Sequence, residues 1–417
     1  MDLRQVGLTY ERQSGKDPSG VYYQSDVLQI LPFLIQAYRA RVQCIYLDPP
    51  FATGKRFSIR VKVGEKDWKS GRGSLDQLVY TDRQPIEDYL SMMRQVLQGC
   101  RELLSDSGLL YLHIDYRMNA RLRLMLDDIF GEKNLLNEIV WAYQTGGRAK
   151  HFFSRKHDTI LLYRKTRNYY FDIKSVAYVK TTGRNNHMKR HVDPDGRIYR
   201  SIRSGGKVYT YYEDDPVYPT DVWDDVSHLQ QKDPQRTGYD TQKPVALLDR
   251  IICSSSRPGD LVMDLFAGSG TTLVSAGKQN RRFVGVDCSP YSFHVVRSRL
   301  KEWNVDYYAP PCIGNPALRV RGFTGIGYYE VELLEYALES GLGPRVFSGM
   351  DALDNWSVGY FRDGAFEPFA SAWRSRSTPN IETHLRLPVF TGTPMIRVAD
   401  VLGRYFFYEL NKDGFEI

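Results

Sequence analysis

The stretch YLDPPFATG, at residues 46–54, places an acid, two prolines and an aromatic directly after a short apolar run. Because Pro49 and Pro50 cannot donate a ladder hydrogen bond, they predict that a strand ends at Asp48. Phe51 then lies beside that strand end. A carboxylate and an aromatic ring at one sheet edge could accept hydrogens from a ligand and stack on its face. An isolated Asp-Pro pair would more often cap a turn, so the rest of the chain has to support this interpretation.

A second stretch, MDLFAGSGTT, has the pattern of a strand followed by a glycine loop. A buried strand is expected to end at Asp264. Gly268 and Gly270 then let a ligand approach the backbone before a helix begins at Thr271. The next strand is expected to end at Asp287, 23 residues after Asp264, where a carboxylate typically accepts hydrogen bonds from ribose hydroxyls. A glycine-rich turn alone is more often a tight connection, but the second acid favours a nucleoside cofactor.

The type of cofactor follows from what the glycine loop lacks. The spacing is not GxGxxG, and ATGKRF at residues 52–57 has no earlier glycine at the offset of a phosphate-binding loop. An acid at each strand end would repel a pyrophosphate. S-adenosyl-L-methionine fits better, because its sulfonium and ammonium groups are attracted by carboxylates.

Strand and helix patterns alternate at both ends of the chain. Helices are expected near 26–39, 85–104, 117–129, 241–256, 271–280 and 289–303, and strands at 44–47, 109–114, 137–144, 158–165, 259–266 and 281–287. These βα units predict that two segments share one parallel sheet. His113 and Asp115 end one of the strands near the proposed site, although a lone histidine there is more often structural.

Composition is that of a globular enzyme whose charge is unevenly distributed. The chain has 417 residues and a net charge of +7, while residues 146–210 alone contain 16 Lys or Arg against 4 Asp or Glu. Cations alternate there with aromatics and amides, a mixture expected where phosphates are neutralised and base edges are read. A solvated basic face is the simpler alternative.

Other classes of protein are disfavoured by what the sequence lacks. No apolar run approaches the length of a membrane span, and the N-terminus lacks the apolar core of a signal peptide, so we expect an intracellular protein with no membrane contact. The five cysteines have no CxxC or HxH partner, so no metal site is expected.

The two motifs together resemble motifs IV and I of the amino DNA methyltransferases, in the order of the β class. LLSDSGLLYLHIDYR, HDTILLYRK and RTGYDTQKP are also similar to blocks in modification subunits of Type III restriction systems and related stand-alone enzymes. The resemblance covers residues 20–165 and 236–303. The sequence departs from the family's pattern at three places. Phe51 stands where the family more often has Tyr, ATG follows it where NTG is usual, and GYDTQKP replaces GYPTQKP.

The resemblance implies a chemical role for each motif. Asp48 and the carbonyl of Pro49 would accept the hydrogens of an exocyclic amine on a flipped-out base, with Phe51 stacked on the base and Pro50 holding the edge rigid. The cofactor-binding residues that it implies, with S-adenosyl-L-methionine as cofactor, are Asp26, Lys243, Asp264, Phe266, Ala267, Gly268, Ser269, Gly270, Thr271 and Asp287. Asp26 could instead cap a helix, and Lys243 could instead mark the start of one; these are the competing interpretations.

The substrate and partners follow from the same resemblance. An acid first in DPPF favours N6 of adenine, with N4 of cytosine as the alternative and a non-catalytic DNA-binding or partner subunit as the alternative from another class. RNA is a further alternative to double-stranded DNA. A restriction subunit and a second copy of the chain, as a homodimer, are both possible partners. The expected location is the cytoplasm, in association with the nucleoid. The DNA-binding candidates are Arg148, Lys150, Arg184, Lys189, Arg190, Arg200 and Arg203.

The predicted fold class is α/β. A Rossmann-like S-adenosylmethionine-dependent methyltransferase sheet would carry an inserted target-recognition region and a small C-terminal α+β appendage. The predicted domains are a catalytic half at 1–165, the insertion at 166–240, a cofactor-binding half at 241–317 and a mostly β accessory domain at 318–417. Within the last, YYEVELLEYALES is expected to form an acidic, Leu-rich helix.

Overall fold

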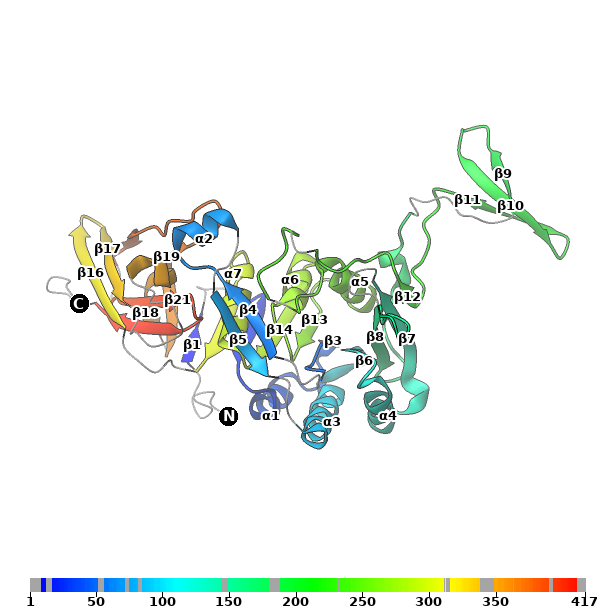
Figure 1. Cartoon of the computed structure of the whole chain (residues 1–417), viewed down its shortest axis with the longest axis horizontal. Helices are drawn as coiled ribbons and strands as arrows, with labels where there is room; N and C mark the ends of the chain where they lie inside the picture. Colours follow the sequence, from blue (N-terminus) through cyan, green and yellow to red (C-terminus); the bar gives the residue numbers. More distant parts are fainter. Residues whose placement is uncertain are drawn as a thin grey trace.

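The structure of the chain is a computed structural model (Figure 1). It describes residues 9–12, 17–51, 56–71, 75–81, 85–143, 149–179, 188–230, 233–239, 241–310, 312, 316–337, 349–362, 364–389 and 393–410. Within these ranges, every helix is too short or too polar to span a lipid bilayer.

A mixed sheet runs along the molecule, with 14 strands in the described part of the chain (Figure 1). The strand order is β12-β7-β8-β6-β3-β13-β14-β2-β15-β1-β19-β18-β21-β22. The first nine are β12 (Val222–Trp223), β7 (Leu135–Ala142), β8 (His157–Arg164), β6 (Leu104–Ile114), β3 (Val42–Leu47), β13 (Leu261–Asp264), β14 (Arg282–Asp287), β2 (Gly20–Gln24) and β15 (Val305–Ala309).

The two predicted segments meet where β3 pairs with β13 in parallel. Every residue of β3 is buried, as expected for a central strand covered on both faces. The prediction of one parallel sheet is wrong for β8, which runs antiparallel to both β6 and β7. Parallel neighbours need a crossover connection, usually a helix, and the described part of the connection between β7 and β8 contains none.

Helices cover both faces of the sheet, and each face has its own apolar core. One face carries α1 (Val27–Tyr38), α3 (Ile86–Leu103) and α4 (Asn119–Phe130), and the other carries α5 (Val245–Ser255), α6 (Thr271–Lys278) and α7 (Pro290–Arg299). Apolar residues at helical spacing explain the buried face of α3, which includes Tyr89, Met93 and Val96.

Two excursions leave this layered core. Strands β4 (Arg56–Val61) and β5 (Leu75–Thr81) pair antiparallel, and α2 (Gly64–Ser70) lies between them in sequence. Within the predicted insertion, η3 (Ile173–Val176) is followed by a three-stranded sheet of β9 (Lys189–Val192), β10 (Ile198–Ser204) and β11 (Lys207–Tyr212). We call β9 to β11 the arm, because it projects from the end of the molecule away from the C-terminal strands (Figure 1).

The C-terminal strands extend the central sheet. Strand β1 (Thr9–Glu11) lies between β15 and β19 and so joins the two parts. Beyond it lie β19 (Ala365–Trp373), β18 (Leu353–Arg362), β21 (Met395–Asp400) and β22 (Tyr405–Glu409), while β16 (Ala317–Gly325), β17 (Tyr328–Ala337) and β20 (His384–Pro388) form a separate sheet, and η4 (Gly349–Ala352) precedes β18. Glu11 is buried between Arg297 of α7 and Arg397 of β21, which links the C-terminal strands to the core.

The predicted helix over YYEVELLEYALES is wrong, because its described residues form strand β17. Its Val331 and Leu333 are buried in a core shared with β16 and β20. Two acids of the segment pair across strands instead of along a helix: Glu330 with Arg386 at 3.3 Å and Glu332 with Arg321 at 3.7 Å. Pairing with neighbouring strands thus overrides the local helical preference.

Candidate functional site

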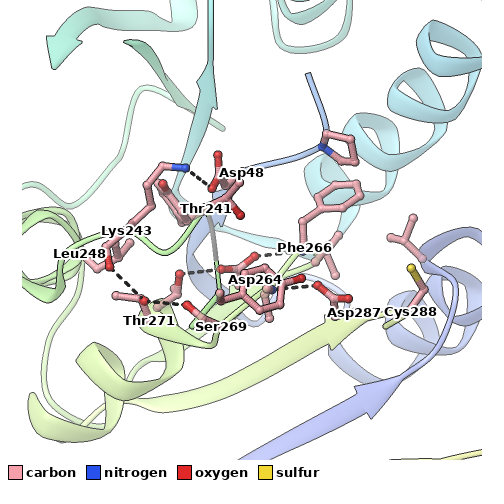
Figure 2. Close-up of a pocket in the computed structure, with 18 of the residues that line it drawn as sticks. Asp48, Thr241, Lys243, Leu248, Asp264, Phe266, Ser269, Thr271, Asp287 and Cys288 are labelled. Atoms are coloured by element: carbon pink, nitrogen blue, oxygen red, sulfur yellow. Dashed lines mark hydrogen bonds and ion pairs between the residues drawn. The ribbon is translucent and has the colours of Figure 1, made fainter. Parts of the chain in front are cut away.

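A cavity opens at the carboxyl edge of the sheet, where β3, β13 and β14 end beside the start of α1 (Figure 2). Parallel strands bring their carboxyl ends to the same edge, so residues far apart in sequence line one space. The cavity is lined by Ser25, Asp26, Val27, Tyr46, Asp48, Pro50, Met92, Tyr239, Thr241, Lys243, Leu248, Asp264, Leu265, Phe266, Ala267, Gly268, Ser269, Thr271, Thr272, Asp287 and Cys288.

The glycine loop connects β13 to α6 in a conformation that requires glycine. Gly268 and Gly270 have φ values of +50° and +74°, in the left-handed region. A Cβ atom on Gly270 would lie 2.8 Å from Cγ2 of Val296 in α7. Ser269 and Thr271 are buried, and their hydroxyls lie 3.2 Å apart. The loop is therefore fixed closely against α7, with its backbone facing the cavity.

The acid at the end of β14 holds this loop in place. Asp287 accepts hydrogen bonds from the backbone N–H of Gly268 at 2.8 Å and of Ser289 at 2.9 Å. Burial raises the pKa of Asp287, and these two hydrogen bonds oppose that rise. A carboxylate offers more acceptor positions than these two bonds use, so Asp287 retains capacity to bind ligand hydroxyls.

Asp264, at the end of β13, is almost fully buried, with 2% of its surface exposed. Its two oxygens accept hydrogen bonds from the backbone N–H of Phe266 at 3.0 Å and the hydroxyl of Thr272 at 2.5 Å. Burial raises the pKa of Asp264 to about 7 despite these bonds, and the charges of Asp48 and Asp287 add to the rise. The cavity therefore concentrates negative charge that a cationic ligand would relieve.

Asp26 both caps a helix and lies at the cavity, positions that the sequence left as alternatives. It is the N-cap of α1, where its side chain accepts hydrogen bonds from the backbone N–H of Leu28 at 2.9 Å and of Gln29 at 3.3 Å. It also lines the cavity. The helix cap thus fixes the carboxylate at the rim of the site.

The catalytic motif follows β3 directly. Asp48 and Pro50 line the cavity, and Pro49 between them is buried. Nζ of Lys243 donates a hydrogen bond to Oδ2 of Asp48 (Figure 2). Lys243, which the sequence predicts to bind the cofactor, lines the cavity, and its backbone carbonyl accepts a hydrogen bond from the Thr271 hydroxyl at 3.2 Å. Its side chain forms an ion pair with the acid of the catalytic motif.

Five aromatic rings extend from the catalytic motif on the side away from the glycine loop. Ring centroids are 6.4 Å apart between Phe51 and His113, 5.5 Å between His113 and Trp141, and 4.2 Å between Trp141 and His228. Tyr143 contacts His228 edge to face, also at 4.2 Å. We call Phe51, His113, Trp141, His228 and Tyr143 the aromatic row.

A hydrogen-bonded chain supports this row from beneath. The Tyr46 hydroxyl lies 2.8 Å from Nδ1 of His113, and Nε2 of His113 lies 3.3 Å from Oδ2 of Asp158. Burial alone would raise the pKa of Asp158, but the hydrogen bond and charge of His113, followed by the charge of Lys243, bring it below its usual value. The lowered pKa keeps Asp158 ionised at neutral pH, so it can accept a hydrogen bond from Nε2 of His113.

Sequence reasoning missed four of these residues. Trp141 and Tyr143 lie at the carboxyl end of β7, so the same rule of strand ends could have identified them. Asp158 begins the antiparallel strand β8, and His228 lies in the loop after β12, which has no chemical motif. Asp115, a lesser candidate from the sequence, accepts a hydrogen bond from the Arg117 side chain at 2.7 Å. Its backbone carbonyl accepts from the N–H groups of Met118 and Asn119 at the start of α4.

The predicted DNA-binding residues are distributed over two regions. Arg148 and Arg184 lie outside the described residues. Lys150 is exposed in the β7–β8 connection, and Lys189, Arg190, Arg200 and Arg203 lie on the arm. Arg190 and Arg200 share Glu213 as an ion-pair partner, at 3.5 and 3.1 Å. The exposed side chains of Lys189 and Arg203 are thus better placed to meet a phosphate than Arg200, which is only partly exposed.

Comparison with known proteins shows which family the chain resembles. Residues 42–297, more than half of the chain, match the family described as DNA methylase (N6_N4_Mtase). The Type II methyltransferase M.EcaI of Enterobacter cloacae is 28% identical over 70% of this chain and 72% of its own length. The DNA adenine methyltransferase YhdJ of Escherichia coli strain K12 is 27% identical over 59% of this chain and 71% of its own.

Two further matches broaden the comparison. The Mod subunit of the Type III restriction-modification enzyme EcoPI, from Escherichia phage P1, is 24% identical over 66% of this chain and 57% of its own. Among solved structures, the PvuII DNA methyltransferase, which is cytosine-N4-specific, aligns with a TM-score of 0.44 and 15% identity over 68% of this chain and 89% of its own.

Proposed function

Because the chain belongs to the DNA methylase family, we propose that it methylates N6 of a flipped-out adenine in double-stranded DNA at a specific site. Family membership confirms the class of enzyme, a DNA amino-methyltransferase, and the S-adenosylmethionine cofactor expected from the sequence. The observation that carries the choice of chemistry is the position of Asp48, next to the glycine loop in one cavity.

The cavity residues fit this cofactor chemically. Four acids, namely Asp26, Asp48, Asp264 and Asp287, line the cavity with Lys243 as the only Lys or Arg among its described lining residues. Such an excess of negative charge attracts a sulfonium and an ammonium group. Gly268, which lines the cavity, has no Cβ and so allows the close backbone approach that an adenosyl group needs. When bound, S-adenosylmethionine supplies the electrophilic methyl group.

The chain contributes by making the target amine nucleophilic. An exocyclic amine is a weak nucleophile because its lone pair is delocalised into the ring. Asp48 and the backbone carbonyl of Pro49 would accept its two hydrogens and favour a tetrahedral nitrogen, with Phe51 stacked on the base. A nitrogen–carbon bond then forms as the sulfur–carbon bond breaks, and the proton lost from the amine passes to solvent past Asp48. Lys243 must release or share Asp48 when the amine enters.

The choice of adenine rests on two observations. The motif begins with Asp, whereas the cytosine-N4 enzymes that this chain resembles more often begin it with Ser. A relative of 27% identity is a DNA adenine methyltransferase. N4 of cytosine remains the second candidate, since the DNA methylase family includes both activities.

The regions outside the catalytic core are assigned by charge and position. We assign target recognition to residues 166–240, because the basic arm lies there and projects beyond the end of the sheet that carries the aromatic row (Figure 1). We assign an accessory role to residues 318–417. Since one relative is a Type III Mod subunit, a restriction subunit is among the partners proposed for this chain, as is a second copy of it.

The first experiment identifies the modified base. Purified protein is incubated with unmethylated bacterial DNA and methyl-labelled S-adenosylmethionine, and the DNA is digested to nucleosides. Label in N6-methyladenosine that is absent with Asp48→Ala is expected. Label in N4-methylcytidine would show that cytosine, not adenine, is the target base. If the protein binds the cofactor but transfers no label, the proposed catalysis on DNA is refuted.

A further inference from the structure

His228 belongs to the aromatic row but comes from the loop after β12, a segment with no chemical motif. It lies within the predicted target-recognition insertion, residues 166–240, between β12 and α5. That loop is fixed to the core, because Nε1 of Trp141 donates to the Val226 carbonyl at 2.7 Å and Arg250 pairs with Asp225 at 2.9 Å. Its position is therefore determined by packing on the catalytic half of the sheet.

The imidazole of His228 packs against two other rings. Trp141 stacks on its face with an interplanar angle of 27°, and Tyr143 meets it at 89°. Phe51 lies in the same row, beyond His113 and Trp141. The row therefore extends from the catalytic motif over β6, β8 and β7, whereas the glycine loop lies on the other side of β3, at β13. The charge of Lys243, which binds Asp48, acts on His228, so the imidazole lies near the catalytic motif.

One nitrogen of His228, Nε2, lacks a hydrogen-bond partner among the described residues although it is buried. A buried polar atom without a partner destabilises a fold, and a ligand that bonds to it relieves that cost. Burial, followed by the nearby charge of Lys243, lowers the pKa of His228 to about 4. At neutral pH the ring is uncharged, with one N–H and one lone pair to offer.

We propose that His228 contacts the target base, with Nε2 forming a hydrogen bond to a ring nitrogen of the flipped-out nucleobase. The inference rests on the proposed function and deepens it. Asp48 binds the exocyclic amine, which adenine and cytosine share, while His228 reads the ring and so contributes to the choice of base. A neutral imidazole suits this task, because ring nitrogens of bases are uncharged acceptors that an N–H can satisfy.

Two variants separate the ring from its nitrogen. His228→Phe keeps the stacking surface and removes Nε2, whereas His228→Gln loses the ring but places an amide at a similar reach. His384→Phe, the same change at a half-exposed histidine of the C-terminal strands, is the matched control. We expect His228→Phe to lower kcat/KM on DNA about 10-fold and His228→Gln to recover part of the loss, with the control unchanged.

Base analogues then identify the contact. Duplexes with the recognised sequence carry adenine, 1-deazaadenine, 3-deazaadenine or 7-deazaadenine at the target, so that each ring nitrogen is replaced by CH while N6 remains. One analogue should lower kcat/KM of the wild type about 10-fold and cause no further loss in His228→Phe. If cytosine is the labelled base, 3-deazacytosine takes their place.

Each outcome distinguishes this inference from the function on which it rests. If His228→Phe responds to every analogue as the wild type does, or keeps full activity, His228 does not contact the base and is a structural residue of the loop. If the wild type labels no duplex at all, the proposed function itself is overturned. Thermal unfolding of both variants shows whether loss of activity reflects loss of folding.

Discussion

Asp264 offers a prediction whose size can be derived from the structure. Its carboxyl group is 2% exposed, and burial raises its pKa to about 7. In the unfolded chain an aspartate has a pKa near 3.9. Between about pH 4 and pH 7, the folded protein therefore binds one more proton here than the unfolded chain does.

The sign and magnitude follow from this difference. The contribution of Asp264 to stability is fully present below about pH 4 and is lost as the pH rises through 7, at about 1.4 kcal/mol per pH unit, or about 4 kcal/mol in all. Asp264→Asn cannot ionise, yet its amide can still accept from Phe266 N–H and donate to the Thr272 hydroxyl. From pH 4 to pH 8, its free energy of unfolding should thus rise by about 4 kcal/mol relative to wild type.

Urea unfolding followed by circular dichroism at several pH values measures this change. The matched control is Asp106→Asn, because the Asp106 side chain is 82% exposed. The control should follow the wild type. If the difference between Asp264→Asn and wild type changes by less than about 1 kcal/mol over this range, the raised pKa is wrong.

The same carboxyl group should make cofactor binding depend on pH. A bound cation favours ionised Asp264, so binding of S-adenosylmethionine should release a proton and become tighter between pH 6 and pH 8. Isothermal titration calorimetry in buffers of different ionisation enthalpy measures that proton. Asp264→Asn should bind more weakly and release none at this position, whereas an unchanged proton release would place the titrating group elsewhere.

Three further perturbations test the other parts of the site. Asp48→Ala should lower methyl transfer more than about 100-fold while the Kd for S-adenosylmethionine, from equilibrium dialysis, stays within a few-fold; retained activity would refute the catalytic assignment. Gly270→Ala should weaken cofactor binding, because a left-handed backbone costs alanine about 1–2 kcal/mol and the new Cβ meets Val296. Adding Val296→Ala should restore part of the affinity; no recovery would mean that backbone strain alone is responsible. Lys189→Ser and Arg203→Ser should each reduce the slope of log binding constant against log salt by about 1 on duplex DNA, and an unchanged slope would remove the arm from the interface.

The sequence by itself determined the elements that supply the site. Apolar periodicity and turn residues are local signals, and they located the helices that follow Pro85 and Gly270 and the strands that end at Asp48, Asp264 and Asp287. Parallel strands of one sheet bring their carboxyl ends to a common edge, so the acids could be grouped before any coordinates were known. The structure places all three acids in one cavity.

Only the tertiary structure decided which side chains meet across that edge. Lys243 is 195 residues from Asp48 in sequence and binds it through space. His228 joins the aromatic row because its loop packs on Trp141, and β17 is a strand because neighbouring strands pair with it. Strand order and loop packing fix such contacts, and neither depends on the local spacing of residues along the chain. A local pattern can therefore place an acid at a sheet edge, but the partner of that acid depends on which elements fold beside it.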